Sequence, residues 1–518
     1  MKKKLLLFTV FGVLGILIVL SIQSVTDFAG RFIYPLDDSY IHLSMAKSFA
    51  ESGVWGITKH EFSSTTSSPF FTFLLSVVIR VFGDWEYIPL VLNSIAGVLL
   101  LVVLHQYLKR YSLITYGVVL LGVLFLMPLH LMIISGMEHV FHTLTMVLIL
   151  FFFRQYIEKG EAGTFWMMVL FSFLATGFRY ESLFFILFIC IYLFFMKREF
   201  SKSILLGVVS LLPVVIYGWL SIREGSFFLP NSLILKGNTF TGLGAFLIRI
   251  GGNIYRGFSV MILFLILLVQ IFVFSKSGKS ISDKIVKNAV GLVVFGGFGI
   301  HVLFANFGWM IRYEAYLAVL VLLAIAPFLE MVFERKKEMK YVFAGIIIVF
   351  AASFYIRFIR MIHYQKVASK NIYEQQIQLA DFLHQYYPNS RVIVNDIGAI
   401  SYFNNIYLLD TFGLGSIKVA ELRKNDHGKF IRNKPLEDYV KKTAIDENFE
   451  LAIVYERWVK MPDDFIKVAT LSIQNNYICG GPTVTFYAIR SQDAGKLRAQ
   501  LTEFSRHIPK DVSLQILK

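Results

Sequence analysis

The stretch KKKLLLFTVFGVLGILIVLSIQS, residues 2–24, places three lysines before a long apolar run. An apolar segment of about 18 residues or more can cross the ~30 Å hydrocarbon core of a bilayer. A cleaved signal peptide has a shorter apolar region of about 7–15 residues and a small-residue cleavage site, which does not follow here. We therefore expect a retained first membrane helix with its basic start in the cytoplasm.

Comparable apolar runs recur along the first 360 positions of the 518-residue chain. The chain is 56% hydrophobic and only 16% charged, whereas soluble domains carry about 25% charged residues. The runs lie near residues 5–23, 70–83, 88–107, 112–133, 138–155, 164–178, 182–196, 203–222, 257–275, 288–307, 314–333 and 340–359. The short run at 70–83 contains Arg80, which predicts a juxtamembrane or re-entrant helix. We expect a polytopic α-helical membrane protein with about 11 full spans.

Basic clusters mark alternate connections between these runs, and such clusters favour the cytoplasmic side. They lie at 2–4, 109–110, 154–159, 197–202, 276–287 and 335–340. They account for much of the net charge of +15 without a nucleic-acid partner. The connections predicted to face outward are 24–87, 134–137, 179–181, 223–256, 308–313 and all residues after about 360.

The tail differs from the rest in composition, which predicts two domains: a transmembrane domain at 1–364 and a small external α/β domain at 365–518. RVIVNDIGAISYF (391–403), ELAIVYE (450–456) and TVTFYAIR (483–490) have the β-branched and aromatic richness of strands. The segment 371–388 has helical spacing and ends at a proline.

Two adjacent acids, Asp37 and Asp38, begin a helical pattern in the first outward segment. Further candidate substrate-binding residues cluster at other outward helix ends and loops: Glu138, Arg179, Glu181, Asn231, Lys236, Arg312 and Glu314. A carboxylate can act as general base toward an attacking hydroxyl, and arginine or lysine can hold a phosphate. Beside a membrane, this set suits transfer from a lipid donor linked through phosphate.

Each of these residues also has a plain structural interpretation. Asp37 and Asp38 suit the first turn of a helix, and Arg179 with Glu181 could form an internal ion pair. Lys236 could be a solvated loop lysine. Arg312 and Glu314 could be an interfacial pair.

The stretch LDDSYIHLSMAKSFAESG followed by SSPFFTFLLSVV resembles the first external loop of C-type (GT-C) integral membrane glycosyltransferases. It is most similar to the mycobacterial terminal arabinofuranosyltransferase family and its bacterial relatives. The resemblance continues in order through SGMEH, FRYES, LPNSLILK, RYEAYL and NDIGAISYFNNIYLLDTFGL. In that last motif the matching positions are Asp396, Gly398, Tyr402, Asp410 and Gly413. The resemblance leaves two roles open for its acids: contact with the acceptor, or a tie between the tail and the membrane part.

The resemblance implies an inverting glycosyltransferase in the bacterial cytoplasmic membrane, with its active site and tail on the extracytoplasmic side. The donor would be a polyprenyl-phosphate sugar and the acceptor a glycan, glycolipid or glycoprotein, with no nucleic acid involved. The catalytic acid would be Asp37 or Asp38, with Asp37 favoured as general base. Some relatives use a divalent cation such as Mg²⁺, Mn²⁺ or Ca²⁺ and others do not. Here Asp37 and Asp38 would be the ligands of such an ion.

The main alternative is a transporter or flippase of a lipid-linked sugar precursor. Transporters place polar residues near the bilayer midplane between repeated halves, whereas here the polar clusters gather at one predicted side. Transfer of another lipid-linked group, such as phosphoethanolamine, would need a nucleophile and a metal cluster of Asp and His. A purely structural subunit of a polysaccharide machinery is the remaining alternative.

Overall fold

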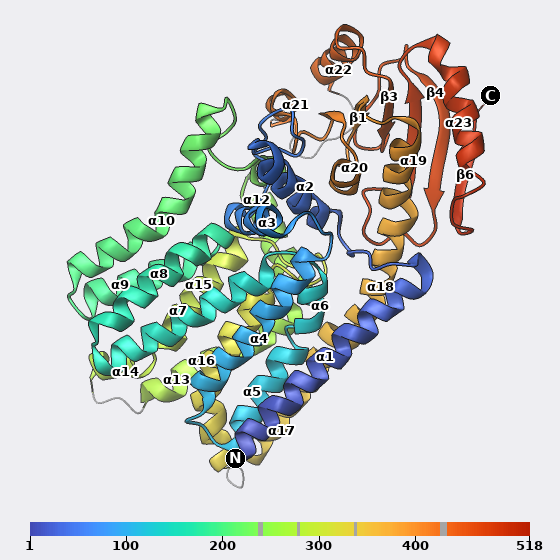
Figure 1. Ribbon diagram of the computed structural model, residues 1–518. Coiled ribbons are helices and arrows are strands. Elements are labelled where there is room, and N and C mark those ends of the chain that lie inside the picture. Colours follow the sequence, from blue (N-terminus) through green and yellow to red (C-terminus); the bar gives the residue numbers. More distant parts are fainter. Residues whose placement is uncertain (237–241, 277–279, 336–338, 425–432, 518) are drawn as a thin grey trace. The chain divides into compact units, whose positions relative to one another are not determined.

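The computed structural model describes residues 1–236, 242–276, 280–335, 339–424 and 433–517 (Figure 1). The chain forms two compact units, each assembled from three separate pieces of sequence. The first unit comprises Met1–Ser21, Leu90–Val215 and Phe240–His363. The second unit comprises Ile22–Pro89, Ile216–Thr239 and Tyr364–Lys518. The first outward segment and the tail therefore fold together.

Within the described ranges, eight helical segments are long and apolar enough to cross a membrane. They are Lys2–Ala29 (α1), Ile88–Leu108 (α4), Leu113–Ile134 (α5, Leu113–Phe125, and α6, Leu129–Ile134), His139–Lys159 (α7), Phe200–Arg223 (α10), Phe258–Lys276 (α13), Ala315–Glu334 (α16) and Tyr341–Tyr386. The last contains α17 (Lys340–Phe354), α18 (Arg360–Ile372), α19 (Gln378–Tyr386) and the π-helical turns Tyr355–Ile359 and Tyr373–Ile377. The prediction of a polytopic α-helical membrane protein is confirmed.

Four shorter apolar helices complete the predicted set of runs: α3 (Pro69–Phe82), α8 (Ala162–Phe178), α9 (Ser182–Phe195) and α15 (Ala289–Phe304). The helix predicted to be juxtamembrane, α3, has only 14 residues. Smaller helices are α2 (Asp37–Ser52), α11 (Asn231–Lys236), α12 (Leu243–Arg256) and α14 (Ile281–Lys287). Since an α-helix rises about 1.5 Å per residue, α3 is too short to cross the hydrocarbon core without tilt or thinning.

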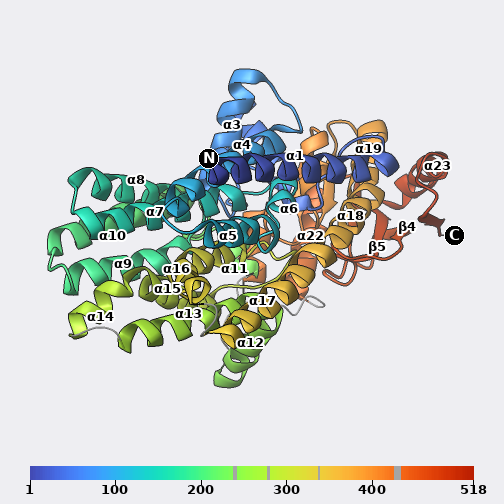
Figure 2. The same cartoon turned by 90° about the horizontal axis from the view of Figure 1, so that it is seen from below.

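The first unit packs around α16, whose buried residues lie on every side of the helix. It contacts α5, α7, α13 and α15 (Figure 2). Small residues allow close helix contacts elsewhere. A Cβ added at Gly297 of α15 would lie 2.5 Å from the ring of Phe185 on α9, and one at Gly296 would collide with Phe188. Close approach at glycine is how membrane helices gain packing energy without a hydrophobic driving force between them.

The second unit contains a six-stranded mixed sheet in the order β2-β1-β3-β5-β4-β6 (Figure 1). The strands are β1 (Arg391–Val394), β2 (Tyr407–Asp410), β3 (Leu451–Val454), β4 (Ile466–Ile473), β5 (Thr483–Ala488) and β6 (Val512–Ile516). β1 is parallel to both β2 and β3, whereas β3–β5, β5–β4 and β4–β6 are antiparallel pairs. The connecting helices are α20 (Gly398–Phe403), α21 (Ile417–Arg423), α22 (Lys434–Asp446) and α23 (Ala494–Phe504).

Side chains alternate between the two faces of this sheet, as the period of two in a strand requires. On one face Ala452 and Val454 join a core cluster with Val419 of α21 and Val440 of α22. On the other face Phe486 of β5 meets Phe382 of α19, which also contacts Phe504 of α23. Helices therefore cover both faces of the sheet. For this reason the short strands β1 and β3 consist almost entirely of apolar residues.

The carboxyl end of β1 is a topological switch point, because the chain continues to β2 on one side and later returns as β3 on the other. In open α/β sheets, crevices at such points commonly bind ligands. Here the crevice receives the start of α2, which packs along α20. At Gly398 the approach is so close that an added Cβ would lie 2.5 Å from Oδ2 of Asp37 and would collide with its main-chain oxygen.

Replacing Gly398 with alanine should destabilise the second unit, because the new methyl group must displace Asp37. Overpacking of this kind costs about 1–3 kcal/mol. We expect a lower unfolding temperature for Gly398→Ala in detergent or nanodiscs. Gly495→Ala is the matched control, since a Cβ there meets nothing within 4 Å and alanine favours helix. Equal unfolding temperatures for both variants would contradict the close contact at Gly398.

Candidate functional site

Asp37 is held by main-chain groups of the tail. Its Oδ2 accepts the N–H of Gly398 at 2.7 Å, and its Oδ1 accepts the N–H of Ala399 at 2.8 Å. Leu36 is the N-cap of α2 and is extended (φ −139°, ψ 132°), so Asp37 occupies the first turn of that helix. The carboxylate therefore lies at the positive end of α2, where an acid is favoured. Its two oxygens bond to the turn that begins α20.

A second carboxyl group, Asp396, meets Asp37 through a side-chain hydrogen bond. Asp396 Oδ2 also accepts a hydrogen bond from Gln376 Nε2 at 2.9 Å and lies 3.1 Å from the Tyr455 hydroxyl oxygen. Burial and the neighbouring charge of Asp37 raise the pKa of Asp396 well above its ordinary range. Burial also raises the pKa of Asp37, partly opposed by its hydrogen bonds, and the charge of Asp38 adds to the rise. Two close carboxyl groups cannot both ionise without cost.

The other candidates of the second unit bind the loop that follows β2. Asn231 is fully buried, and its Nδ2 donates to the carbonyl oxygen of Leu414 at 3.0 Å. The same oxygen accepts the hydroxyl of Thr65 at 2.8 Å. Asn231 thereby ties the first outward segment and the tail together within this unit. Lys236 ends α11, but its side chain lies outside what the structure describes.

Three candidates of the first unit form one ion-pair cluster. Arg179 Nη1 lies 2.6 Å from Oε1 of Glu138, and its Nη2 lies 2.5 Å from Oε1 of Glu181. Glu138 precedes α7 and is 0% exposed, and Arg179 and Glu181 lie between α8 and α9. The guanidinium also lies 5.5 Å from the ring of Tyr313. The sequence predicted all three residues for one site, and the fold brings them together.

Arg312 adjoins this cluster through the same tyrosine, with its guanidinium 5.1 Å from the Tyr313 ring. Glu314 points elsewhere. Its Oε1 accepts Nη1 of Arg357 at 3.1 Å, and its Oε2 accepts the N–H of Gly308 at 2.9 Å. Glu314 thereby holds the turn at 308–311. Three successive non-glycine residues of this turn have positive, left-handed φ values: Trp309 (47°), Met310 (60°) and Ile311 (53°). Backbone strain of this kind is often stored at functional sites.

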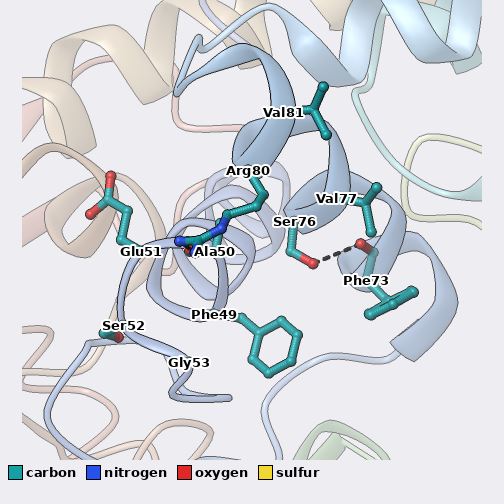
Figure 3. A pocket seen from close by; sticks show the side chains of 10 residues that line it. All are labelled: Phe49, Ala50, Glu51, Ser52, Gly53, Phe73, Ser76, Val77, Arg80 and Val81. Carbon is teal, nitrogen blue, oxygen red and sulfur yellow. Dashed lines mark hydrogen bonds between the residues drawn. The ribbon is translucent and has the colours of Figure 1, made fainter.

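Two cavities of the second unit lie along α2. One of about 530 Å³ lies between the C-terminal ends of α2 and α3, where Arg80 Nη1 donates to the carbonyl oxygen of Ala50 at 2.9 Å (Figure 3). It lies near the far end of α2 from Asp37, about 20 Å along the helix axis. The other, of about 390 Å³, is lined by α2, α20 and the segment before β1. Its hydroxyl and amide side chains, such as Ser48, Asn389 and Asn405, suit a hydroxyl-rich ligand.

The sequence predicted Asp37 and Asp38 as the ligands of any divalent ion. Across the described residues, no group of three or more His, Cys, Asp or Glu side chains is arranged to hold a metal. Both oxygens of Asp37 already accept main-chain N–H groups. Carboxylate and carbonyl oxygens are the usual ligands of Mg²⁺ and Ca²⁺, and an ionised carboxylate has further lone pairs beyond those that accept these N–H groups.

Sequence reasoning missed three residues that the fold brings into these sites. Asp396 stood in a quoted motif but was not named as a site residue. Tyr455 follows a buried strand, and Arg357 interrupts an apolar run. The signal for Arg357 was present, because an ionisable side chain inside a membrane segment needs a partner. The need of Arg357 for a partner could have pointed to Glu314, which accepts its guanidinium.

Removing Arg179 should destabilise the first unit, because it leaves the buried carboxylate of Glu138 without its guanidinium. Removing one partner of a buried ion pair lowers the free energy of unfolding by about 3–5 kcal/mol. We expect a clear fall in unfolding temperature for Arg179→Ala in detergent. Arg110→Ala is the matched control, because its partner Glu158 and Arg110 itself are exposed and such pairs contribute about 0–1 kcal/mol. Equal stability of the two variants would contradict the ion-pair assignment.

The raised pKa of Asp396 makes the stability of the second unit depend on pH. Between the ordinary pKa near 3.8 and the raised value, the folded state binds more protons than the unfolded state. Stability therefore falls as pH rises through that window. We expect the unfolding temperature to fall as pH rises above the ordinary range of an aspartic acid, and the fall to be smaller in Asp396→Asn. Asp438→Asn, which removes an exposed acid of the same unit, should keep the wild-type slope.

Comparisons by sequence match the tail alone. Residues 370–487 match a family model described as a domain of unknown function (DUF8728). No curated protein matches the chain.

Comparisons with solved structures cover nearly the whole chain. The structure of ArnT from Cupriavidus metallidurans bound to undecaprenyl phosphate matches with a TM-score of 0.55 and 12% identity, over 94% of this chain and 98% of that one. The archaeal oligosaccharyltransferase AglB from Archaeoglobus fulgidus, in complex with an inhibitory peptide and a dolichol-phosphate, matches with a TM-score of 0.50 and 12% identity, over 99% and 76%.

The mycobacterial arabinofuranosyltransferase AftD matches with a TM-score of only 0.43 and 11% identity, over 93% of this chain and 40% of that one. This likeness is too weak to bear on the sugar. ArnT and AglB are GT-C glycosyltransferases. The match to them confirms the predicted fold class: the chain is a multi-pass membrane protein with the GT-C fold.

Proposed function

We propose that the chain is an inverting glycosyltransferase that moves a sugar from a polyprenyl-phosphate donor to an extracytoplasmic glycan, lipid or protein acceptor. The fold supports this proposal, since ArnT is seen with undecaprenyl phosphate and AglB with dolichol-phosphate and a peptide. The site would lie on the outer side of the bacterial cytoplasmic membrane, as the distribution of basic loops predicts.

The observation that carries the proposal is the geometry at the start of α2. Asp37 is a partly buried acid fixed by two main-chain N–H groups, with Asp38 beside it, in the segment that follows the first membrane helix. A carboxylate whose orientation is fixed before the substrate binds loses little conformational entropy, and needs little reorganisation, when the transition state forms. Perturbed pKa values of carboxyl groups cluster at functional sites, and burial raises the pKa of Asp37.

The reaction needs only groups of this kind. A hydroxyl of the acceptor attacks the anomeric carbon of the donor sugar and a new C–O bond forms on the face opposite the leaving group. The bond from that carbon to the phosphate oxygen breaks, and the polyprenyl phosphate leaves with the electron pair. The hydroxyl proton passes to the carboxylate of Asp37 or Asp38, acting as general base. The negative charge that develops on the phosphate requires cations.

Arg179, Arg312 and Lys236 are the cations we propose for the phosphate. Arg179 and Arg312 flank one tyrosine ring in the first unit. Arg179 already pairs with two carboxylates, and Arg312 brings a second guanidinium to the same tyrosine ring. Glu138 and Glu181 then orient Arg179, and Asn231 supports the loop after β2.

Asp37→Asn and Asp38→Asn test the proposal. The amide keeps the size of the side chain but accepts no proton, so loss of a general base should lower transfer about 10²–10⁴-fold. We expect this loss in one of the two variants, with donor binding retained. Transfer would be measured on purified protein in nanodiscs, with a panel of polyprenyl-phosphate pentoses and hexoses and with extracted envelope glycans as acceptors.

Asp438→Asn is the matched control, since it removes an exposed acid elsewhere in the second unit. It should leave transfer unchanged. Wild-type transfer rates in both aspartate variants would place the chemistry elsewhere. Donor lipid that crosses the membrane without any transfer would replace this proposal by the flippase alternative.

A further inference from the structure

We infer that Asp396 of the tail is a positioning residue for the transfer reaction, which holds the carboxylate of Asp37 in its working orientation. The inference rests on the proposed function and deepens it. It assigns to the tail a part in the chemistry.

The first step is that Asp37 depends on the tail for its orientation. Its hydrogen bonds to Gly398 and Ala399 join residues that are 361 and 362 positions apart in sequence. No side-chain cap bond of α2 itself is formed at its N-terminus. A turn of four residues, 396–399, therefore supplies two main-chain donors and one carboxyl group to the same acid.

The second step is that buried polar side chains of the tail hold Asp396 in place. The Tyr455 hydroxyl lies 2.6 Å from Gln375 Oε1, 2.7 Å from Gln376 Nε2 and 3.1 Å from Asp396 Oδ2. Tyr455 is 0% exposed and follows β3 directly. Gln375 in turn donates to the carbonyl oxygen of Gly481 at 3.1 Å.

The third step is the local structure that allows this. Gln375 and Gln376 are successive residues, which an α-helix would point about 100° apart. They lie in the π-helical turn Tyr373–Ile377, where both reach the same hydroxyl group. Such turns are uncommon and frequently occur at functional sites.

The fourth step is a count of protons. Tyr455 has one hydroxyl proton, and the shortest contact directs it to Gln375. The amide of Gln376 has two protons, one for the Tyr455 oxygen and one for Asp396 Oδ2. A hydrogen bond between two carboxyl groups needs a proton on one of them. Asp37 accepts two N–H groups and is the carboxylate, so Asp396 is the donor.

The geometry thus gives each group one role. Asp396 donates to Asp37, the turn 397–399 supplies two N–H donors, and the Gln376 amide, which also donates to the Tyr455 oxygen, holds Asp396 in place. A reacting group misplaced by about 1 Å can lose about 10²-fold in rate. Loss of Asp396 should therefore lower the rate of transfer without weakening donor binding.

The experiment compares Asp396→Ala with Asp396→Asn in the nanodisc transfer assay. Asparagine can still donate to Asp37 through its amide N–H and accept from Gln376, whereas alanine can do neither. We expect kcat to fall about 10- to 100-fold in Asp396→Ala and to stay within about 3-fold of wild type in Asp396→Asn. The KM for the donor should stay within about 2-fold in both. Asp438→Ala, at an exposed acid of the same unit, should leave both constants unchanged.

Unfolding temperatures are recorded for each variant, and Asp396→Leu replaces Asp396→Ala if the alanine protein does not fold. Wild-type kcat in the alanine or leucine variant overturns the inference, as does an equal loss in Asp396→Asn. A wild-type protein that transfers sugar from no donor overturns the proposed function instead, so the two failures are distinguishable.

Discussion

The structure of the second unit depends on one carboxylate that is held by two main-chain N–H groups. Asp37 bonds to Gly398 and Ala399 with heavy-atom distances of 2.7 and 2.8 Å. Charge-assisted hydrogen bonds of this length are roughly twice as strong as neutral ones. They require that α2 and α20 approach without a side chain between them, which only glycine at 398 permits. The first outward segment and the tail are one folding unit for this reason.

The position of this bond follows from the topology of the sheet. Parallel strands bring their carboxyl ends to one edge, and a change of direction between neighbours leaves a crevice there. Many α/β proteins fill that crevice with a soluble ligand. Here a side chain from a distant part of the same chain fills it, and Asn395 and Tyr455 join the ends of β1 and β3 behind it. The place where other α/β proteins bind a ligand is here an internal contact that orients Asp37.

Hydropathy was sufficient to predict the membrane part, because each helix must satisfy its backbone within the bilayer and bury about 20 apolar residues. It also marked α3 as a juxtamembrane or re-entrant helix, through its length and Arg80, although α9 is equally short. The cluster of Glu138, Arg179 and Glu181 was predictable because charged residues at the ends of membrane helices rarely lack a partner. The tail was harder. The segment 398–403 reads as a strand by composition, yet it is helical, because the chain must turn at Gly398 to accept Asp37. The pairing of Asp37 with Asp396 could not be read from either segment, since nothing local distinguishes a buried carboxyl partner from a solvated one.

The interleaving of the two units also has a consequence for biosynthesis. Asp37 enters the membrane region early, but its partners at 396–399 are made 361 or so residues later. At about 5–20 residues per second, ribosomes need about 20–70 s to cover that interval. During this time the Asp37 side chain has no fixed orientation, although the first helices are already inserted into the membrane. If Asp37 is the general base, as proposed, a nascent chain cannot transfer sugar from a lipid-linked donor until residues 396–399 have folded against it.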